Sequence, residues 1–448
     1  MEIFVSKNLI KIAKEFKKND STLYIVGGFV RNNFLRLENT DIDVCGNLPG
    51  DKVIGICTEK FGFNAFVVNK KLGTVLIKIS DDEEYEYTTF RKENYRFGGS
   101  HSPESVDFIT DIRVDAKRRD FTCNALYYDI LNKEIIDFYG GVKDIERKQL
   151  KAIETPAFVF SSDGLRLLRL VRLNSEFGFK VEKQTLKIAR AMNYQLQDIS
   201  AERRLKEIKQ IVVADFRYEN IGNRDFIQTF NDLNLYPYLF NKSLKSFKVK
   251  KDKLYKNFFK LDKRFRFWGF LCLVLKNHLK QKNLSFKQIK FASNKLFGID
   301  GLRVSNTDME AVMSGYYVIQ KMSKITRKTN LEELAMEYAA LTDKVQEFLS
   351  DFNVKNLEKV LKIVDECKEK NIPLAPDELK ITNRELIDEV GLKNEYISRV
   401  RVALFRLAIN RKIENKKSVL LEKAKTIATR LMEQEEKNNP KKNKKSKK

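Results

Sequence analysis

Two aspartates, Asp41 and Asp43, stand two positions apart in the stretch NTDIDVCG, with an isoleucine between them and a valine after them. The alternating apolar residues predict a β-strand, in which side chains two positions apart project from the same face. Two carboxylates placed so close together repel each other unless a positive charge lies between them. A divalent cation suits this position, because two carboxylates and substrate phosphate oxygens make a common Mg²⁺ shell. A solvated loop at a strand end is the alternative interpretation.

A glycine pair upstream supports the metal interpretation. In IVGGFVRNNFLRL an apolar strand runs into Gly27 and Gly28, a helix-like segment follows, and Arg31 falls in its first turn. Glycines let the backbone approach a phosphate closely, and the N–H groups at a helix start attract anions. The strand, the glycines, the arginine and the aspartates on the next strand together predict a triphosphate site beside a metal ion.

A row of charged residues recurs along SSDGLRLLRLVR. Asp163, Arg166, Arg169 and Arg172 are spaced three apart, which predicts that they line one sector of a helix. A structural row of arginines would usually alternate with acids, whereas this row has a single acid at its N-terminal end. We therefore interpret it as a polar face directed toward a ligand.

The elements that must position these residues divide the chain in two. Strand-like segments separated by Gly, Asn and Asp concentrate in residues 21–140, and long amphipathic runs follow after about residue 150. The pattern predicts an α+β fold with a mixed sheet, followed by an all-helical remainder. A length of 448 residues exceeds what one hydrophobic core usually serves, so we expect several domains.

The net charge of +24 indicates a polyanionic partner. Segment 242–268 interleaves Lys and Arg with aromatic residues, a pattern that suits RNA, although a helix with a buried aromatic face and solvated lysines is an equal alternative. Five scattered cysteines and two histidines disfavour a disulfide framework or a zinc site. No run approaches the ~20 apolar residues of a membrane span. We expect a cytoplasmic protein without membrane association, and infer no protein partner.

The charged motifs together resemble a known family. GGFVRNNFL followed by TDIDV is similar to the signature of the nucleotidyltransferases related to polymerase β, in the bacterial class II branch of CCA-adding enzymes and poly(A) polymerases. Further stretches agree in order and spacing, namely YEYTTFRKENYR, KRRDFTCNALYYD, SSDGLRLLRLVRLNSEFGF and ISAERRLKEI. The resemblance covers roughly residues 20–210.

The resemblance implies roles for the residues of the head. Asp41 and Asp43 would hold two Mg²⁺ ions, one lowering the pKa of the RNA 3′-hydroxyl and one bridging the nucleotide phosphates. Glu86 could be a third catalytic carboxylate, or a plain surface residue. Nucleotide-binding positions implied here, besides Gly27, Gly28 and Arg31, are Arg119, Asp120 and Asn124.

The resemblance also implies that Asp163 and Arg166 act as a template for the incoming base, with Arg169 and Arg172 continuing toward the phosphates or the primer. Cytosine and adenine each present an amino donor beside a ring-nitrogen acceptor, which a carboxylate and a guanidinium can match together. Two residues depart from the family pattern. Asn32 stands where an aspartate is usual, and Ser162, a potential helix cap, where an acid is usual.

The implied organisation is a catalytic head over 1–150, a helical neck with the base-selecting template over 151–220, a helical body and tail that bind tRNA over 221–430, and a disordered basic tail over 431–448. The implied activity is Mg²⁺-dependent addition of CCA to the 3′ end of tRNA from CTP and ATP, with release of pyrophosphate. A loop between Phe90 and Arg118 resembles the flexible loop of full CCA-adding enzymes. The alternatives are a poly(A) polymerase, a specialised A-adding or CC-adding enzyme, and a non-catalytic RNA-binding protein.

Overall fold

The computed structural model of the protein describes residues 3–38, 41–95, 103–218, 225–279, 283–326 and 329–438. The chain forms two compact units, one from residues 1–250 and 292–305 and the other from residues 251–291 and 306–448. Residues 96–102 of the predicted flexible loop and residues 439–448 of the predicted basic tail lie outside the described residues.

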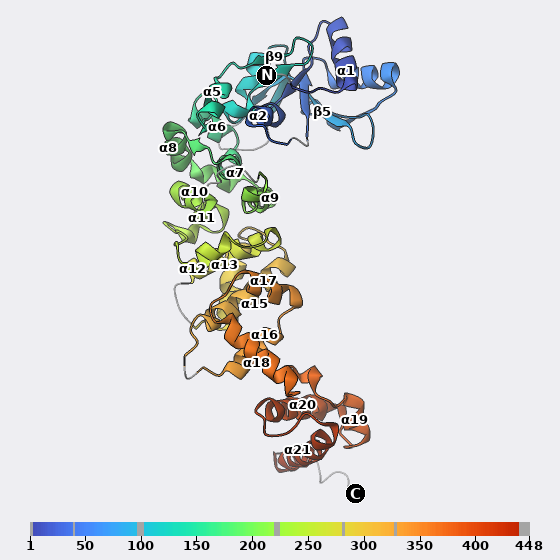
Figure 1. The fold of residues 1–448 in the computed structure, drawn as a ribbon, viewed down its shortest axis with the longest axis vertical. Helices are drawn as coiled ribbons and strands as arrows, with labels where there is room; N and C mark the ends of the chain where they lie inside the picture. Colours follow the sequence, from blue (N-terminus) through green and yellow to red (C-terminus); the bar gives the residue numbers. More distant parts are fainter. Residues whose placement is uncertain are drawn as a thin grey trace. The chain divides into compact units, whose positions relative to one another are not determined.

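A mixed seven-stranded sheet lies in the N-terminal part of the first unit (Figure 1). In spatial order its strands are β3 (Asn64–Asn69), β4 (Thr74–Lys78), β5 (Glu84–Thr89), β2 (Asp43–Gly46), β1 (Tyr24–Val26), β8 (Tyr127–Asp129) and β9 (Glu134–Ile136). Strand β2 pairs antiparallel with β1 and parallel with β5. This mixed sheet, followed by helices, confirms the predicted α+β fold class.

Smaller elements complete the first unit. A hairpin is formed by β6 (Arg91–Asn94) and β7 (Ser105–Phe108), and β10 (Gln149–Leu150) pairs parallel with β11 (Lys180–Val181). The helices of this unit are α1 (Lys7–Lys18), α2 (Gly28–Leu35), α3 (Gly50–Gly55), α4 (Ile112–Lys117), α5 (Gly141–Glu146), α6 (Pro156–Ser162), α7 (Arg166–Phe177), α8 (Lys183–Ala191), α9 (Ala201–Ile211), α10 (Phe226–Leu233) and α11 (Tyr236–Leu239). A 3₁₀ turn, η2 (Thr122–Asn124), precedes β8.

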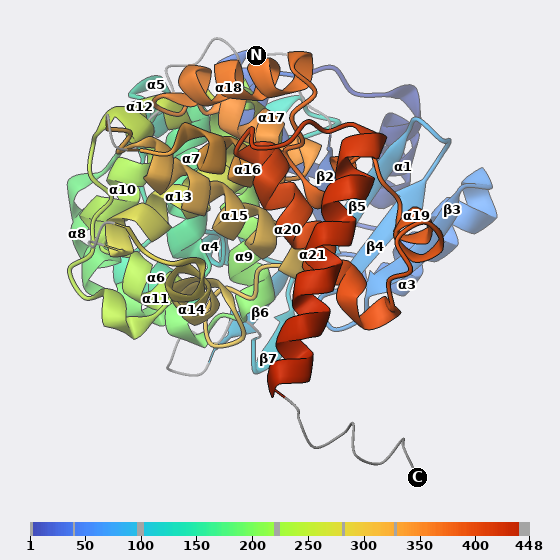
Figure 2. The ribbon, with the colours of Figure 1, turned by 90° about the horizontal axis from the view of Figure 1, so that it is seen from below.

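The second unit is helical throughout its described residues. Its helices are α12 (Lys253–Phe258), α13 (Arg266–His278), α15 (Asn306–Met322), α16 (Leu331–Ala339), α17 (Asp343–Asp351), α18 (Leu357–Glu369), α19 (Asn383–Asp388), α20 (Asn394–Ile409) and α21 (Lys417–Asn438), and α14 (Phe286–Phe297) crosses the boundary between the units. Figures 1 and 2 both show α20 and α21 side by side, as their packing around a shared apolar cluster requires.

Helix α21 continues into the segment 431–448 that we predicted to be disordered. The helix ends at Asn438, and Leu431 and Met432 pack against the buried cluster formed with α20. The helix therefore extends past the predicted boundary at residue 431 and ends where the lysine-rich stretch begins.

The aromatic residues of segment 242–268 are mostly part of the apolar core. Tyr255, Phe258, Phe265 and Trp268 are all buried, while the lysines between residues 242 and 263 are exposed. Of the two interpretations of this segment, a buried aromatic face with solvated lysines is therefore the one that the structure contains. Its buried rings are not available to stack on bases.

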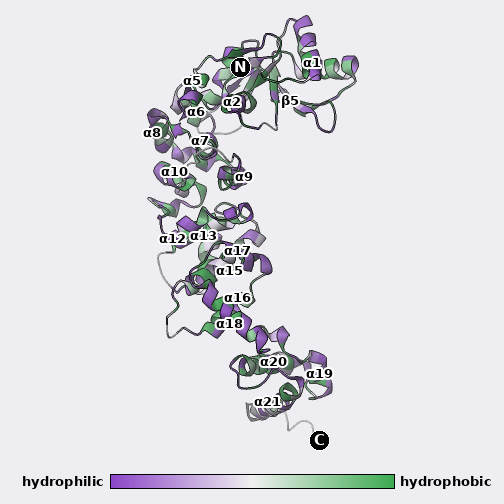
Figure 3. Ribbon diagram, in the orientation of Figure 1, coloured by the Kyte–Doolittle hydropathy of each residue, from purple (hydrophilic) through white to green (hydrophobic). Residues whose placement is uncertain are grey.

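Apolar and polar residues are interspersed along the helices of both units (Figure 3). Among the described residues, none of the helices combines the length and the apolar character needed to cross a membrane.

Candidate active site

A cavity of about 760 Å³ opens in the first unit, lined by the start of β2, the segment that follows α4, and helices α7 and α9. All of the predicted nucleotide-binding residues line it, and so does Asp43. These residues are Gly27, Gly28, Arg31, Arg119, Asp120, Asn124, Asp163, Arg166, Arg169 and Arg172. Asp41 and Glu86, which we also predicted as site residues, do not line this cavity.

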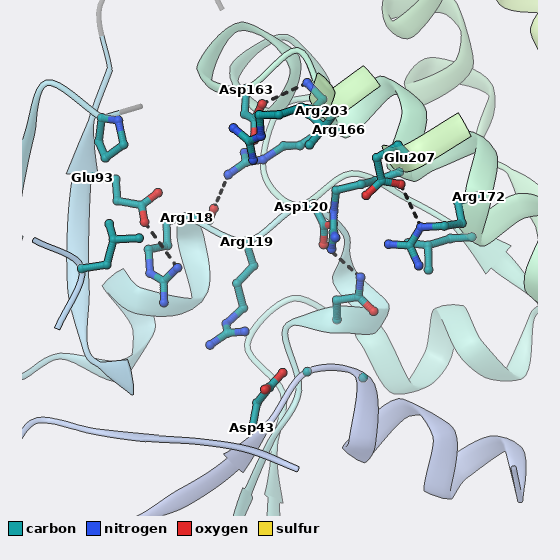
Figure 4. Close-up of a pocket in the computed structure, with 18 of the residues that line it drawn as sticks. Asp43, Glu93, Arg118, Arg119, Asp120, Asp163, Arg166, Arg172, Arg203 and Glu207 are labelled. Carbon is teal, nitrogen blue, oxygen red and sulfur yellow. Dashed lines mark hydrogen bonds and ion pairs between the residues drawn. The ribbon is translucent and has the colours of Figure 1, made fainter. Parts of the chain in front are cut away.

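Asp43 is the first residue of β2, and Asp41 lies just before the strand. The parallel pairing of β2 with β5 sets Asp43 opposite Glu86. Desolvation in the site raises the pKa of Asp43 to about 6, the charge of Glu86 acts in the same direction, and Arg119 opposes it. Figure 4 shows the Arg119 side chain pointing toward Asp43. Negative charge is thus concentrated at the start of β2.

Carboxylate oxygens of this kind suit a hard divalent cation. In the part of the chain that the structure describes, however, no group of three or more His, Cys, Asp or Glu side chains is placed to hold a metal. Asp41, Asp43 and Glu86 therefore do not form a closed three-carboxylate cage. A cation held by the two aspartates would keep positions open for oxygens from outside the protein, as substrate phosphates provide.

The glycine turn between β1 and α2 lies beside the start of β2. Gly27 has a φ of +76°, a conformation that favours glycine, and α2 begins at the next residue. Arg31, one turn into α2, is buried with its guanidinium 4.3 Å from the centre of the Phe177 ring. The guanidinium donates to the amide oxygens of Asn32 and Asn124.

Asn32, which departs from the family pattern, holds this arginine in place. Its amide oxygen accepts from Arg31 Nε and Nη2 at 3.0 and 2.8 Å, and its amide nitrogen donates to the Tyr218 hydroxyl at 2.9 Å. The amide thus makes hydrogen bonds at this position but brings no charge. Burial lowers the pKa of Arg31, and the carboxylates of Glu176 and Asp120 act against that shift.

Asp115, on α4, organises the two arginines of the RRDFT motif. This fully buried carboxylate accepts from Arg118 Nε at 2.8 Å, from Arg119 Nη2 at 3.2 Å and from the Tyr127 hydroxyl at 2.7 Å. Burial acts to raise the pKa of Asp115, but the charges of Arg118 and Arg119 outweigh it and lower the pKa to about 2. The motif alone is compatible with arginines that face the nucleotide and with arginines that face solvent. In the structure, the Asp115 carboxylate holds both guanidinium groups in place.

Asp120, in the same motif, is the partner of Arg169. Its carboxylate accepts from Arg169 Nε at 2.7 Å and Nη2 at 2.6 Å, and from the Asn124 amide at 3.0 Å. Although burial opposes the shift, the charge of Arg169 and the hydrogen bond from Asn124 lower the pKa of Asp120. The network joins η2 to α7 and shapes one wall of the cavity.

The helix that carries the predicted row of charged residues, α7, begins later than we expected. Helix α7 starts at Arg166, while Asp163 ends α6 in an extended conformation, so the four charged residues do not share one helix. Gly164 lies between Asp163 and the start of α7. Its backbone packs so closely on Gln195 that a Cβ would lie 2.3 Å from the carbonyl oxygen of that residue, so only glycine fits there. Asp163 still lines the cavity together with the arginines.

Ser162 was expected to cap the helix, and that prediction is wrong. No side chain caps the start of α7. The Ser162 hydroxyl accepts instead from Arg166 Nη1 at 2.9 Å and donates to the carbonyl of Val159. Arg166 also donates through Nη2 to the carbonyl of Arg118 at 2.6 Å (Figure 4). Arg166 is therefore oriented by α6 and by the RRDFT motif.

Arg172 lies deeper in the neck and is paired with acids from two helices. Its guanidinium contacts Glu207 on α9 at 3.0 Å and Glu176 on α7 at 3.2 Å. Arg172 thus meets one acid four residues further along its own helix and one from α9, whereas the acid that Arg169 meets comes from outside α7.

Several site residues escaped the sequence analysis. Asp115 was signalled by its position three and four residues before the two arginines, which is helical spacing. Glu93, on β6, accepts from Arg91 at 2.6 Å and lies 3.5 Å from Arg118. Figure 4 shows Arg203 of α9 pointing toward Asp163. No local spacing in the sequence indicates these long-range positions.

Comparisons with known proteins agree with this geometry. The family described as the poly A polymerase head domain matches residues 23–151. The CCA-adding enzyme of Bacillus subtilis is 28% identical over 325 residues, 69% of this chain and 76% of that protein. The CCA-adding enzyme of Bacillus pumilus is 38% identical over 189 residues, 42% of this chain and 45% of that protein.

Residues 23–151 therefore match a poly A polymerase head domain, and the chain is similar to CCA-adding enzymes well beyond the head. Solved structures of CCA-adding enzymes share the fold along nearly the whole chain. A Bacillus stearothermophilus CCA-adding enzyme in complex with CTP has a TM-score of 0.63 at 20% identity, covering 95% of this chain and 98% of that one. A Thermotoga maritima CCA-adding enzyme complexed with tRNA has a TM-score of 0.62 at 15% identity, covering 94% and 96%.

Proposed function

We propose that this protein is a template-independent RNA polymerase that adds CCA to the 3′ end of tRNA from CTP and ATP, releasing pyrophosphate. The observation that carries the proposal is one cavity lined by a strand-end aspartate, a glycine turn and the Asp163–Arg166 pair. The similarity of the chain to CCA-adding enzymes of Bacillus species supports the choice of tRNA as substrate. We also propose a cytoplasmic location, where these substrates are found.

Nucleotidyltransferases of this family use a divalent metal ion, and we assign its site here to Asp41 and Asp43. Bound Mg²⁺ would lower the pKa of the RNA 3′-hydroxyl and neutralise negative charge on the phosphates. The raised pKa of Asp43 supports this assignment, because a crowded carboxylate gains most from a cation. Glu86, opposite Asp43, would add negative charge without closing the shell.

The remaining residues of the head would hold the nucleotide. The N–H groups after Gly27 and the Arg31 guanidinium face the same cavity and suit the triphosphate. Arg119, fixed by Asp115 and Tyr127, would carry positive charge toward the reacting phosphate. Asp120 and Asn124, which are hydrogen-bonded to each other, would line the part of the cavity that takes the sugar and base.

Base selection would fall to Asp163 and Arg166 at the start of the neck. An ionised carboxylate accepts from the amino group of cytosine or adenine, and a guanidinium donates to the neighbouring ring nitrogen. Uracil and guanine offer a carbonyl and a ring N–H in those places, and a buried site with such mismatched polar groups rejects a substrate by roughly 10⁴-fold. Residues 221–430 would then bind the tRNA through their exposed lysines.

Two alternatives remain distinct from this proposal. A poly(A) polymerase shares the head domain and would use ATP alone, and a non-catalytic RNA-binding protein would use no nucleotide. The test is to incubate tRNA lacking its CCA end with each labelled nucleotide in turn, using the wild type and Asp43→Asn. We expect incorporation from CTP by the wild type only. Tight RNA binding without incorporation from any nucleotide would favour the non-catalytic protein.

A further inference from the structure

A second cavity, of about 330 Å³, lies within the second unit and is remote in sequence from every motif of the head and neck. It is lined by α12, the C-terminal end of α13, α15 and the connection between α17 and α18. Its wall includes the buried side chains of Leu254, Tyr316, Ile319 and Val354. A volume above ~300 Å³ with apolar walls is typical of sites for small organic groups.

The polar groups of the wall leave one hydroxyl available. The Gln320 amide is used by the backbone of Leu284 on both its oxygen and its nitrogen, and the Asn257 amide nitrogen donates to two carbonyls. Tyr316 is 4% exposed, and its hydroxyl has no hydrogen-bond partner in the part of the chain that the structure describes. This hydroxyl can therefore bond to a ligand in the cavity.

The opening of the cavity is positively charged. Four lysines line it, namely Lys253, Lys276, Lys324 and Lys355. Lys276 pairs with Asp252 and Lys324 donates to Asn283. Lys253 and Lys355 are exposed and meet no carboxylate among the described residues. The apolar wall favours an occupant with a flat, apolar body, and the lysines favour one with an anionic end.

We propose that this cavity takes one unpaired nucleotide of the RNA substrate, with the base against the apolar wall and Tyr316 and the adjoining phosphates at Lys253 and Lys355. The inference rests on the proposed function only in that RNA is the partner. An unpaired base splayed from an RNA loop buries its faces on aromatic and apolar side chains while phosphates contact cations. Because the contacts are with the apolar wall and the phosphates, recognition would tolerate any base.

Photo-crosslinking of a tRNA transcript containing 4-thiouridine to the full chain tests the site directly. We expect mass spectrometry to find crosslinks on peptides of α12 and α15, and unlabelled tRNA but not millimolar AMP to compete them away. Competition by AMP alone would assign the site to free nucleotides and overturn the proposal. The absence of crosslinks from these helices, or protection by oleate but not by tRNA, would also overturn it.

Ile319→Trp should fill the cavity, abolish the crosslink and weaken tRNA binding about tenfold, in line with loss of one stacked base. Val402→Trp, on an exposed part of α20, is the matched control and should change neither. If Ile319→Trp does not fold, the double substitution Lys253→Ala, Lys355→Ala should weaken the same crosslink. Unaltered crosslinks in the folded variants would contradict the site. CTP incorporation, measured in the same samples, reports separately on the proposed function.

Discussion

Asp43 of β2 and Glu86 of β5 lie opposite each other in a parallel strand pair, and Asp43 lines the candidate active-site cavity. Their like charges, with Asp41 two residues before Asp43, are the arrangement that a cation relieves. Replacing Asp41 or Asp43 by Ala should lower nucleotide incorporation by at least about 10³-fold, since metal-ion catalysis supplies several kcal/mol. Filter binding should find tRNA affinity nearly unchanged, because in the proposed function residues 221–430 hold the RNA.

Glu86→Gln separates a supporting charge from a ligand. We expect the Mg²⁺ concentration for half-maximal activity to rise a few-fold while the rate at saturating Mg²⁺ stays close to that of the wild type. An unchanged Mg²⁺ dependence would make Glu86 a surface residue. Near-normal turnover of Asp43→Ala would remove the metal assignment altogether.

Asp115→Asn should impair both stability and nucleotide binding. Removing one buried charge leaves Arg118 and Arg119 without their partner, which costs about 3–5 kcal/mol. Because the folded-state pKa of Asp115 is about 2, below its usual 3.8, the wild type keeps this stabilisation at neutral pH and loses it as the pH falls through that range. The variant should lack this acid-dependent loss in thermal melts.

The catalytic readout is a rise of roughly tenfold in KM for CTP, because Arg119 loses its fixed orientation in the cavity. Asp129→Asn is the matched control, since Asp129 is a buried carboxylate that accepts from the backbone of a turn away from the cavity. Equal KM values for the two variants would reduce Asp115 to a structural role.

Arg166→Ala should relax the choice of base. Loss of one charged partner should cost ~1–3 kcal/mol of discrimination against UTP and GTP, as for a bidentate base contact. Since Arg166 also donates to Ser162 and to the Arg118 carbonyl, some loss of stability is expected as well. Incorporation of each nucleotide by the wild type and the variant separates the roles, because an equal loss for all four would identify Arg166 as scaffold.

Base selection should depend on pH through Asp163. Burial raises its pKa to about 6, so the carboxylate accepts a hydrogen bond from an amino group above that pH and loses this capacity as it protonates below it. The preference for CTP over UTP should therefore fall as the pH drops from 8 to about 5.5. Titration of the nucleotide phosphates affects CTP and UTP alike, so it cancels in the ratio of their incorporation rates. Asp163→Asn should have a pH-independent preference, and a wild-type ratio that ignores pH would contradict the assignment.

The exposed lysines of segment 242–268 should contribute to the salt dependence of RNA binding. Replacing Lys245, Lys248, Lys256 and Lys260 by Ala should flatten the plot of log affinity against log salt by about 0.9 for each phosphate that the protein no longer neutralises. Four exposed lysines of the head serve as the control for net charge, namely Lys14, Lys17, Lys52 and Lys70. Equal slopes for the two quadruple variants would mean that this segment is not an RNA-binding face.

Local patterns in the sequence were sufficient for much of the head. The strand that carries Asp43 and the glycine turn at Gly27 follow from period-two alternation and from the φ values that only glycine adopts easily. Asp41, which we placed on the same strand, lies just before it. The predicted nucleotide-binding residues come from several motifs, and the fold brings all of them to one cavity.

Long-range pairing was not accessible to the same reasoning. Asp120 and Glu207, which pair with Arg169 and Arg172, come from distant elements, although Glu176, the other partner of Arg172, lies one turn further along α7. Similarly, the composition of segment 242–268 could not distinguish rings that face RNA from rings that face the core. Both questions depend on which surfaces pack together, which the spacing along one segment does not determine.

The nucleotide sequence added to the RNA decides whether the protein is a full CCA-adding enzyme. Full-length protein is incubated with CTP, ATP and Mg²⁺ and a tRNA transcript that lacks its last three nucleotides, and the 3′ ends are sequenced. We predict that C, C and A are added in that order and that extension then stops. Products carrying A alone or long runs of A would contradict the proposed function, as would products that end after CC in the presence of ATP.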